Sequence, residues 1–71
     1  MDYRERIVVD PAIRFGKPVI KGTRICVFDI LEYMAGGDSE DDILDEFPQL
    51  SREDIRACLA FAADRQLPRP A

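Results

Sequence analysis

The spacing of the apolar residues changes at Val27, and this change constrains the fold more than any other feature of the sequence. Before it, short β-branched runs alternate with proline and glycine. This pattern predicts a ribbon of two or three short strands with loops over residues 5–26. After it, apolar residues recur at i, i+3, i+4 and i+7, which predicts a helix over residues 27–36. Gly36 and Gly37 end this helix, since glycine readily takes the left-handed conformation found at helix ends.

Two further helices are predicted by their capping residues. Each begins with a serine at the N-cap and has an aspartate three residues later, at the position of a capping box. These pairs are Ser39 with Asp42 and Ser51 with Asp54. The second helix spans residues 39–47, because Pro48 disfavours helical geometry at the residue before it. The third helix spans residues 51–65, and residues 66–71 form a loose tail.

Together these elements predict one domain, residues 1–71, that is mainly helical with a small N-terminal β element. The expected arrangement is a three-helix, helix-turn-helix-like domain of the homeodomain-like or winged-helix-like kind. A chain of 71 residues has a thin core, which rarely supplies more than about 3–5 kcal/mol of stability by itself. Disulfides, a metal ion or a partner subunit usually supply the rest.

The cysteine and histidine content argues against disulfides and a metal ion as the sources of added stability. We expect no export signal and no membrane span, and therefore a cytoplasmic protein in which Cys26 and Cys58 are free, buried thiols. The sequence has no histidine, which removes the commonest general base and the commonest zinc ligand. We expect no enzyme activity, no metal site and no cofactor. Self-association into a homodimer is then the expected source of added stability.

Charge is distributed unevenly along the chain. Residues 1–25 carry six Lys or Arg against three Asp or Glu, whereas residues 26–71 carry four against eleven. Such asymmetry indicates two surfaces with different partners. Asp41, Asp45 and Glu46 predict an acidic surface for a basic protein partner on the second helix. The alternative is that these carboxylates form an ordinary solvated helix face.

The second and third predicted helices form a unit of helix-turn-helix size. In a DNA-binding version, the start of the third helix would enter the major groove. The candidate base contacts are Gln49, Arg52 and Arg56, and the candidate phosphate contacts are Lys17, Lys21 and Arg24. Alternatively, these are solvated side chains and a tight strand connection. The acidic second helix weighs against DNA, since its carboxylates would repel phosphates.

Several apolar residues are candidates for a dimer or partner interface. They are Ile7, Val9, Phe28, Tyr33 and Phe61. The three aromatic residues lie off the centres of their helices' apolar stripes and exceed what a thin core needs. The alternative is that they are isolated surface aromatics in contact with water.

One run of the sequence is specific enough to indicate a family. Residues 16–24 read Gly-x-Pro-x-Ile-x-Gly-Thr-Arg, with Asp10-Pro11 before the run and Gly37, Phe47-Pro48 and Asp54-Ile55 after it. On these residues the stretch from Val9 to Ala63 resembles the domain of unknown function 433 family of small bacterial and archaeal proteins.

The resemblance implies a compact, commonly dimeric helix-turn-helix-like fold with an N-terminal β element. It also implies a role as the antitoxin of a type II toxin–antitoxin pair, beside a PIN-like ribonuclease toxin. Such an antitoxin would neutralise the toxin by binding it and would repress its own operon through the helix-turn-helix. The acidic body suits a basic, RNA-binding toxin surface. The alternative function is a protein-interaction adaptor without DNA binding.

Overall fold

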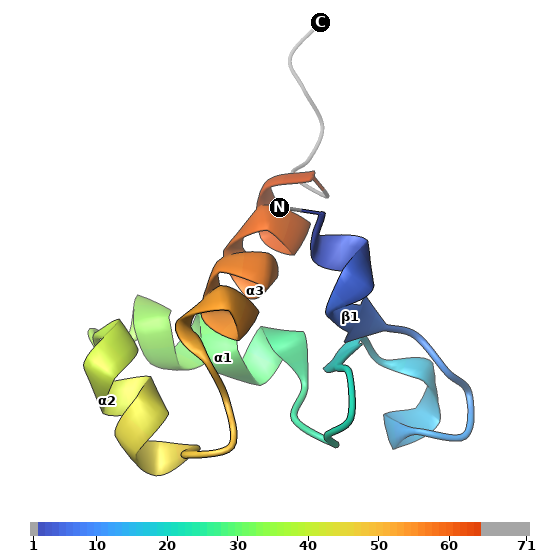
Figure 1. The fold of residues 1–71 in the computed structure, drawn as a ribbon, viewed down its shortest axis with the longest axis horizontal. Helices are drawn as coiled ribbons and strands as arrows, with labels where there is room; N and C mark the ends of the chain where they lie inside the picture. The colour runs from blue at the N-terminus through green and yellow to red at the C-terminus, as the bar shows by residue number, and fades with distance from the viewer. Residues whose placement is uncertain (1, 65–71) are drawn as a thin grey trace, which may run out of the picture.

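A computed structural model describes residues 2–64 and shows three α-helices preceded by a small β element (Figure 1). The elements in chain order are η1 (Tyr3–Glu5), β1 (Ile7–Val8), η2 (Arg14–Gly16), β2 (Val19–Ile20), α1 (Val27–Ala35), α2 (Glu40–Glu46) and α3 (Arg52–Asp64). Helices α1 and α3 pack against each other, with α2 at one end of the molecule and the η2 loop at the other. The predicted fold class is confirmed.

The helices lie close to their predicted ranges because the capping residues set where they begin. At α2, Ser39 Oγ accepts a hydrogen bond from the Asp42 backbone N–H at 3.1 Å, and an Asp42 carboxylate oxygen accepts one from the Ser39 N–H at 2.8 Å. Ser51 and Asp54 make the same reciprocal pair at the start of α3, at 3.0 and 3.3 Å. Both predicted capping boxes are confirmed. The predicted end of the third helix at residue 65 and the tail at residues 66–71 lie outside the described residues.

The β element is a two-stranded antiparallel ribbon in which Ile7 pairs with Ile20 and Val8 with Val19. The third strand that the sequence pattern allowed does not form within the described residues. Cys26 makes only an isolated bridge to Val19, and the chain enters α1 at the next residue. The ribbon is too short to be stable alone, so it depends on packing against the helices.

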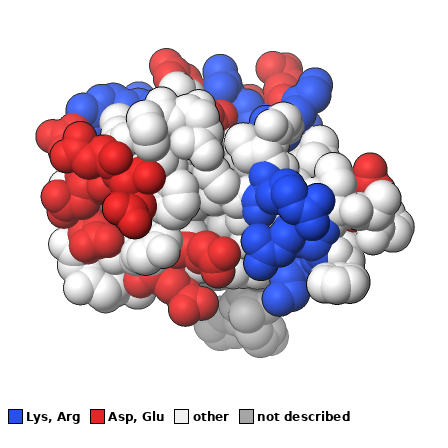
Figure 2. Space-filling model, turned by 90° about the horizontal axis from the view of Figure 1, so that it is seen from below, with Lys and Arg blue, Asp and Glu red and all other residues white. Residues whose placement is uncertain are grey.

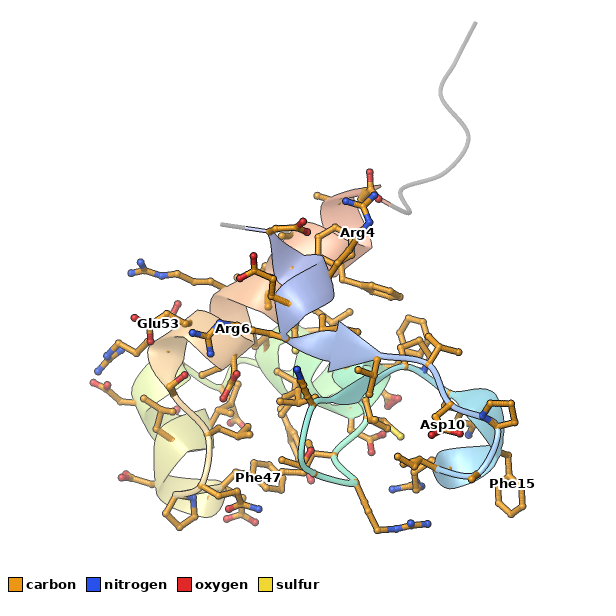
Figure 3. All side chains as sticks on the ribbon, turned by 45° about the vertical axis from the view of Figure 1, so that its right-hand side comes forward. Arg4, Arg6, Asp10, Phe15, Phe47 and Glu53 are labelled. Carbon is orange, nitrogen blue, oxygen red and sulfur yellow. The ribbon has the colours of Figure 1, made fainter. Side chains whose placement is uncertain are left out.

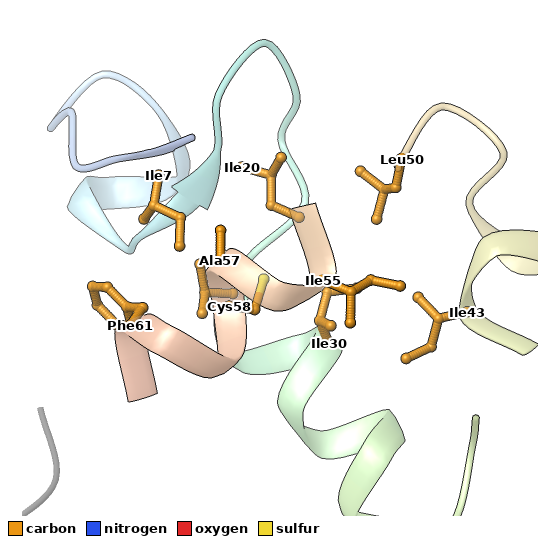
Figure 4. Packing of buried hydrophobic residues seen from close by; sticks show 10 residues of the cluster. Ile7, Ile20, Ile30, Ile43, Leu50, Ile55, Ala57, Cys58 and Phe61 are labelled. Atoms are coloured by element: carbon orange, nitrogen blue, oxygen red, sulfur yellow. The ribbon is translucent and has the colours of Figure 1, made fainter. Parts of the chain in front are cut away.

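Side chains from the ribbon and all three α-helices meet in one core (Figure 4). Ile20, Ile30, Ile43 and Ile55 come from four different elements, and each is at most 1% exposed. Burying an isoleucine contributes about 1.5–3 kcal/mol. The packing of these four side chains therefore holds the ribbon and α2 to the α1–α3 pair.

Both cysteines are buried and unpaired within the described chain, as predicted. Burial raises the pKa of the Cys58 thiol to about 12, and the nearby Asp54 carboxylate adds to the rise. A thiol with this pKa is almost entirely protonated near neutral pH and is a poor nucleophile. Cys58 is therefore a packing residue.

The structure corrects part of the predicted apolar interface. Ile7 is 7% exposed and Phe61 is 5% exposed, so both side chains belong to the core and not to an open surface. The reason is that η1 and β1 fold back onto α3, where the Tyr3 ring meets the edge of Phe61 at 5.7 Å between ring centres. An ion pair of 3.1 Å between Arg6 and Asp54 fixes the same segment to the start of α3.

Candidate functional site

The predicted acidic surface lies on α2 and is open to solvent. Asp41, Asp45 and Glu46 are all exposed. Viewed from below, carboxylates gather on the side of the molecule where α2 lies, and a separate patch of Lys and Arg occupies the other side (Figure 2). The asymmetry seen along the sequence is therefore also a separation in space.

A groove lies between the end of α1 and α2, on this acidic side. It has a volume of about 350 Å³, and its lining residues are Tyr33, Asp38, Asp42, Ile43, Glu46 and Phe47. The Tyr33 and Phe47 rings lie 5.8 Å apart between centres and are inclined by 51°. Asp29 and Glu32 line a second hollow that also touches Tyr33. The groove thus combines aromatic walls with carboxylates.

This combination suits an organic cation better than a metal ion. Within residues 2–64, no group of three or more His, Cys, Asp or Glu could hold a metal. One of the lining carboxylates, Asp42, is already engaged by the Ser39 N–H. An Arg or Lys side chain, in contrast, gains both from aromatic faces and from carboxylates that need not converge on one point.

The start of α3 is not a free base-reading surface. Arg52 pairs with Glu40 at 3.2 Å and also with Asp41. The hydrogen bond to Asp41 and, to a smaller extent, the one to Glu40 raise the pKa of the Arg52 guanidinium above its usual value. Gln49 and Arg56 are exposed beside it. The structure therefore places two acidic side chains of α2 against Arg52, one of the three residues expected to contact bases.

The other predicted DNA contacts lie in the loops on either side of β2. Lys17, Lys21 and Arg24 are exposed, and Arg14 donates a hydrogen bond to the Arg24 carbonyl at 3.0 Å. The structure thus divides the six candidate DNA residues between the region around the start of α3 and the loops beside β2. We call Arg14, Lys17, Lys21 and Arg24 the basic end.

Phe15, at the basic end, is a candidate functional residue that the sequence did not reveal. Its ring is 96% exposed, and Figure 3 shows it projecting from the η2 loop. Its backbone is left-handed, with φ 59° and ψ 32°. Arg14 and Gly16, on either side, also have positive φ, 51° and 84°. The left-handed conformation costs a residue with a side chain roughly 1–2 kcal/mol, and such strain gathers at functional sites.

The remaining predicted interface residues are partly open. Val9 is 62% exposed, Phe28 48% and Tyr33 43%. The Phe28 ring also contacts Phe61, at 6.1 Å between ring centres. Of these three, only Tyr33 lines the acidic groove.

The fold and its surfaces define a class: small three-helix domains with an N-terminal β ribbon and separate acidic and basic surfaces. The chain belongs to the family described as protein of unknown function (DUF433), whose model matches residues 7–62. The predicted family is thereby confirmed. No helix within the described part of the chain is long and apolar enough to cross a membrane.

Two relatives illustrate the family. An uncharacterized protein of Sinorhizobium fredii, y4eO, is 37% identical over 59 residues, which make up 83% of this chain and 27% of that protein. A crystal structure of a DUF433 member from Anabaena variabilis matches with a TM-score of 0.81 and 27% identity, over 84% of this chain and 59% of the other. This chain therefore spans about a quarter of the length of the first relative and just under three fifths of the second.

Proposed function

We propose that the protein is an antitoxin that neutralises a basic ribonuclease toxin by binding it through the acidic groove. The observation that carries this proposal is the pairing of the Tyr33 and Phe47 rings with exposed carboxylates in one hollow of about 350 Å³. An RNA-binding surface is rich in Arg and Lys. The groove offers such a surface both opposite charge and aromatic faces.

In the proposed complex, an Arg or Lys side chain of the toxin enters between α1 and α2. Its charged group lies near Asp38 and Glu46, and its stem packs on the rings of Tyr33 and Phe47. Arginine in a desolvated aromatic pocket is a frequent source of binding energy at protein interfaces. The surrounding carboxylates of α2 steer the partner toward the groove and increase the association rate.

The test is the affinity of the chain for the PIN-like product of a neighbouring gene, measured by calorimetry. Asp38→Asn with Glu46→Gln is expected to weaken binding at least about tenfold, because each removes a charge that faces the partner. The matched control is Glu5→Gln with Glu53→Gln, which removes two exposed carboxylates outside the groove. Equal weakening by both pairs would show that only net charge matters and would count against the groove.

DNA binding is a second candidate function, and the exposure of Lys17, Lys21 and Arg24 favours it. Because Arg52 is held by two carboxylates, we place the phosphate contacts at the basic end. In a gel shift with DNA from upstream of the operon, Lys17→Ala with Lys21→Ala is expected to reduce binding more than Arg52→Ala does. If no shift occurs even at low salt, the adaptor function without DNA binding remains.

A further inference from the structure

The η2 loop is closed by hydrogen bonds, but it leaves the Phe15 ring uncovered. The Ile13 N–H donates to the Asp10 carbonyl at 2.8 Å, and the Lys17 N–H donates to the Arg14 carbonyl at 3.1 Å. The ring between them is 96% exposed, and none of the ring contacts within the described part of the chain involves it. The loop therefore presents an aromatic face to solvent on a hydrogen-bonded turn.

The residues around Phe15 in the sequence carry positive charge that forms no ion pair. Residues 11–28 contain four Lys or Arg and no Asp or Glu. The carboxylate that precedes them, Asp10, already accepts a hydrogen bond from the Ala12 N–H at 2.9 Å. Arg6 and Arg52 each pair with a carboxylate, whereas within the described residues no side chain of the basic end does so. These charges are therefore available to an anion.

The chain and one hydrogen bond bring three of these cations to the η2 loop. Arg14 directly precedes Phe15, and Lys17 follows it two residues later. The loop after β2 joins them, because the Arg14 guanidinium donates to the Arg24 carbonyl at 3.0 Å. Lys17 and Arg24 are exposed. An uncovered aromatic ring beside cations is the combination with which proteins bind single-stranded nucleic acids.

We propose that the η2 loop binds a single-stranded nucleic acid, with an unpaired base stacked on the Phe15 ring and the neighbouring phosphates on Lys17 and Arg24. Every base has a π-face, so such stacking does not depend on sequence. Inside a duplex the faces of each base are covered by its neighbours, and aromatic side chains stack instead on bases that are unpaired and turned outward. The proposal is independent of the antitoxin function. Unlike the DNA binding considered above, it requires both Phe15 and an unpaired base.

A base fits this loop better than a protein surface or a membrane does. Between residues 10 and 24, Phe15 is the only large hydrophobic side chain that is exposed. Protein interfaces and membrane anchors need a larger apolar area, whereas the stacking of one base needs a single ring. The left-handed backbone at Phe15 agrees with a binding role, since strained residues of this kind gather at ligand-binding sites.

The first test compares the affinity of the full chain for a fluorescein-labelled oligothymidine strand and for a DNA duplex of the same length, by fluorescence anisotropy at low salt. The strand should bind more tightly. Phe15→Ala should weaken strand binding at least about tenfold, as loss of a stacked ring does, and should leave duplex binding unchanged. Phe15→Trp should retain strand binding. The control is Leu59→Ala, which shortens a side chain that is 41% exposed on α3 and should change neither affinity.

The dependence of strand binding on salt tests the phosphate contacts. Each phosphate of a single strand that a protein neutralises contributes about −0.7 to the slope of the log association constant against log salt concentration. Lys17→Gln and Arg24→Gln should therefore each make the slope shallower by about 0.7. The matched control is Arg4→Gln, which removes an exposed cation that lies at a different end of the molecule from Phe15 (Figure 3). It should leave the slope unchanged.

Three results would overturn the proposal. The first is the absence of strand binding at every salt concentration. The second is an equal effect of Phe15→Ala on strand and duplex, including no effect on either. The third is binding that depends on Phe15 to vesicles of equal parts phosphatidylserine and phosphatidylcholine, without strand binding, which would assign the ring to a membrane surface.

Discussion

At Phe15 the conformation of the backbone determines the direction in which the side chain points. Three successive residues with positive φ turn the chain so that the ring points into solvent. Asparagine or glycine at position 15 would have indicated such a turn, but phenylalanine does not. The left-handed conformation is imposed by the surrounding loop, so periodicity and propensity could not predict it. Periodicity and propensity could not predict the exposure of the Phe15 ring either.

Replacing Phe15 by glycine should stabilise the monomer. Glycine adopts the left-handed conformation without a steric penalty, although it loses more chain entropy on folding. The net gain in the free energy of unfolding is expected to be about 0.5–1 kcal/mol. Chemical denaturation at a concentration low enough to exclude self-association measures it. The same change at Lys17, whose own φ is −71°, should destabilise the chain slightly. A loss of stability for Phe15→Gly would show that the turn is not strained.

Exposure of single residues was the least predictable part of the candidate site. Ile7 and Phe61 were expected at an interface, yet both are buried because η1 and β1 fold onto α3. Arg52 was expected to be free for DNA, yet α2 places Glu40 and Asp41 beside it. Each outcome depends on an element distant in sequence, which local spacing does not describe.

At the scale of elements, the sequence predicted the helices well because their signals are local. Ser39 and Ser51 each cap a helix with an aspartate three residues on, and the apolar period indicates which face packs inward. The sequence did not decide between two strands and three in the ribbon, since strand pairing depends on a remote partner. In the structure, only Cys26 bridges to Val19 before α1 begins.

The cap of α2 should contribute directly to the acidic groove, because Asp42 both caps the helix and lines the groove. Ser39→Ala removes the acceptor for the Asp42 N–H and is expected to cost about 1 kcal/mol. For a domain of this size that corresponds to a fall in Tm of roughly 4–8 °C, measurable by circular dichroism. Ser39→Asn, which keeps a side-chain acceptor, should retain most of the stability. An unchanged Tm for Ser39→Ala would mean that the cap does not hold α2.

At the scale of the whole molecule, the proposed function depends on how charge is distributed over the fold. The sequence indicated a basic first third and an acidic remainder. The fold converts this into a cluster of carboxylates on the α2 side of the molecule and a separate patch of Lys and Arg (Figure 2). The groove itself was not predictable, because Tyr33 and Phe47 meet only when α1 and α2 pack together.

The central claim is that the groove between α1 and α2 receives the protein partner. The most direct test is to titrate the ¹⁵N-labelled chain with the proposed partner, a PIN-like ribonuclease, and to follow the backbone amide signals of the chain. Signals from Tyr33 and from residues 38–47 should change first and most. Changes confined to the start of α3 or to the basic end, with the groove signals unmoved, would contradict the claim.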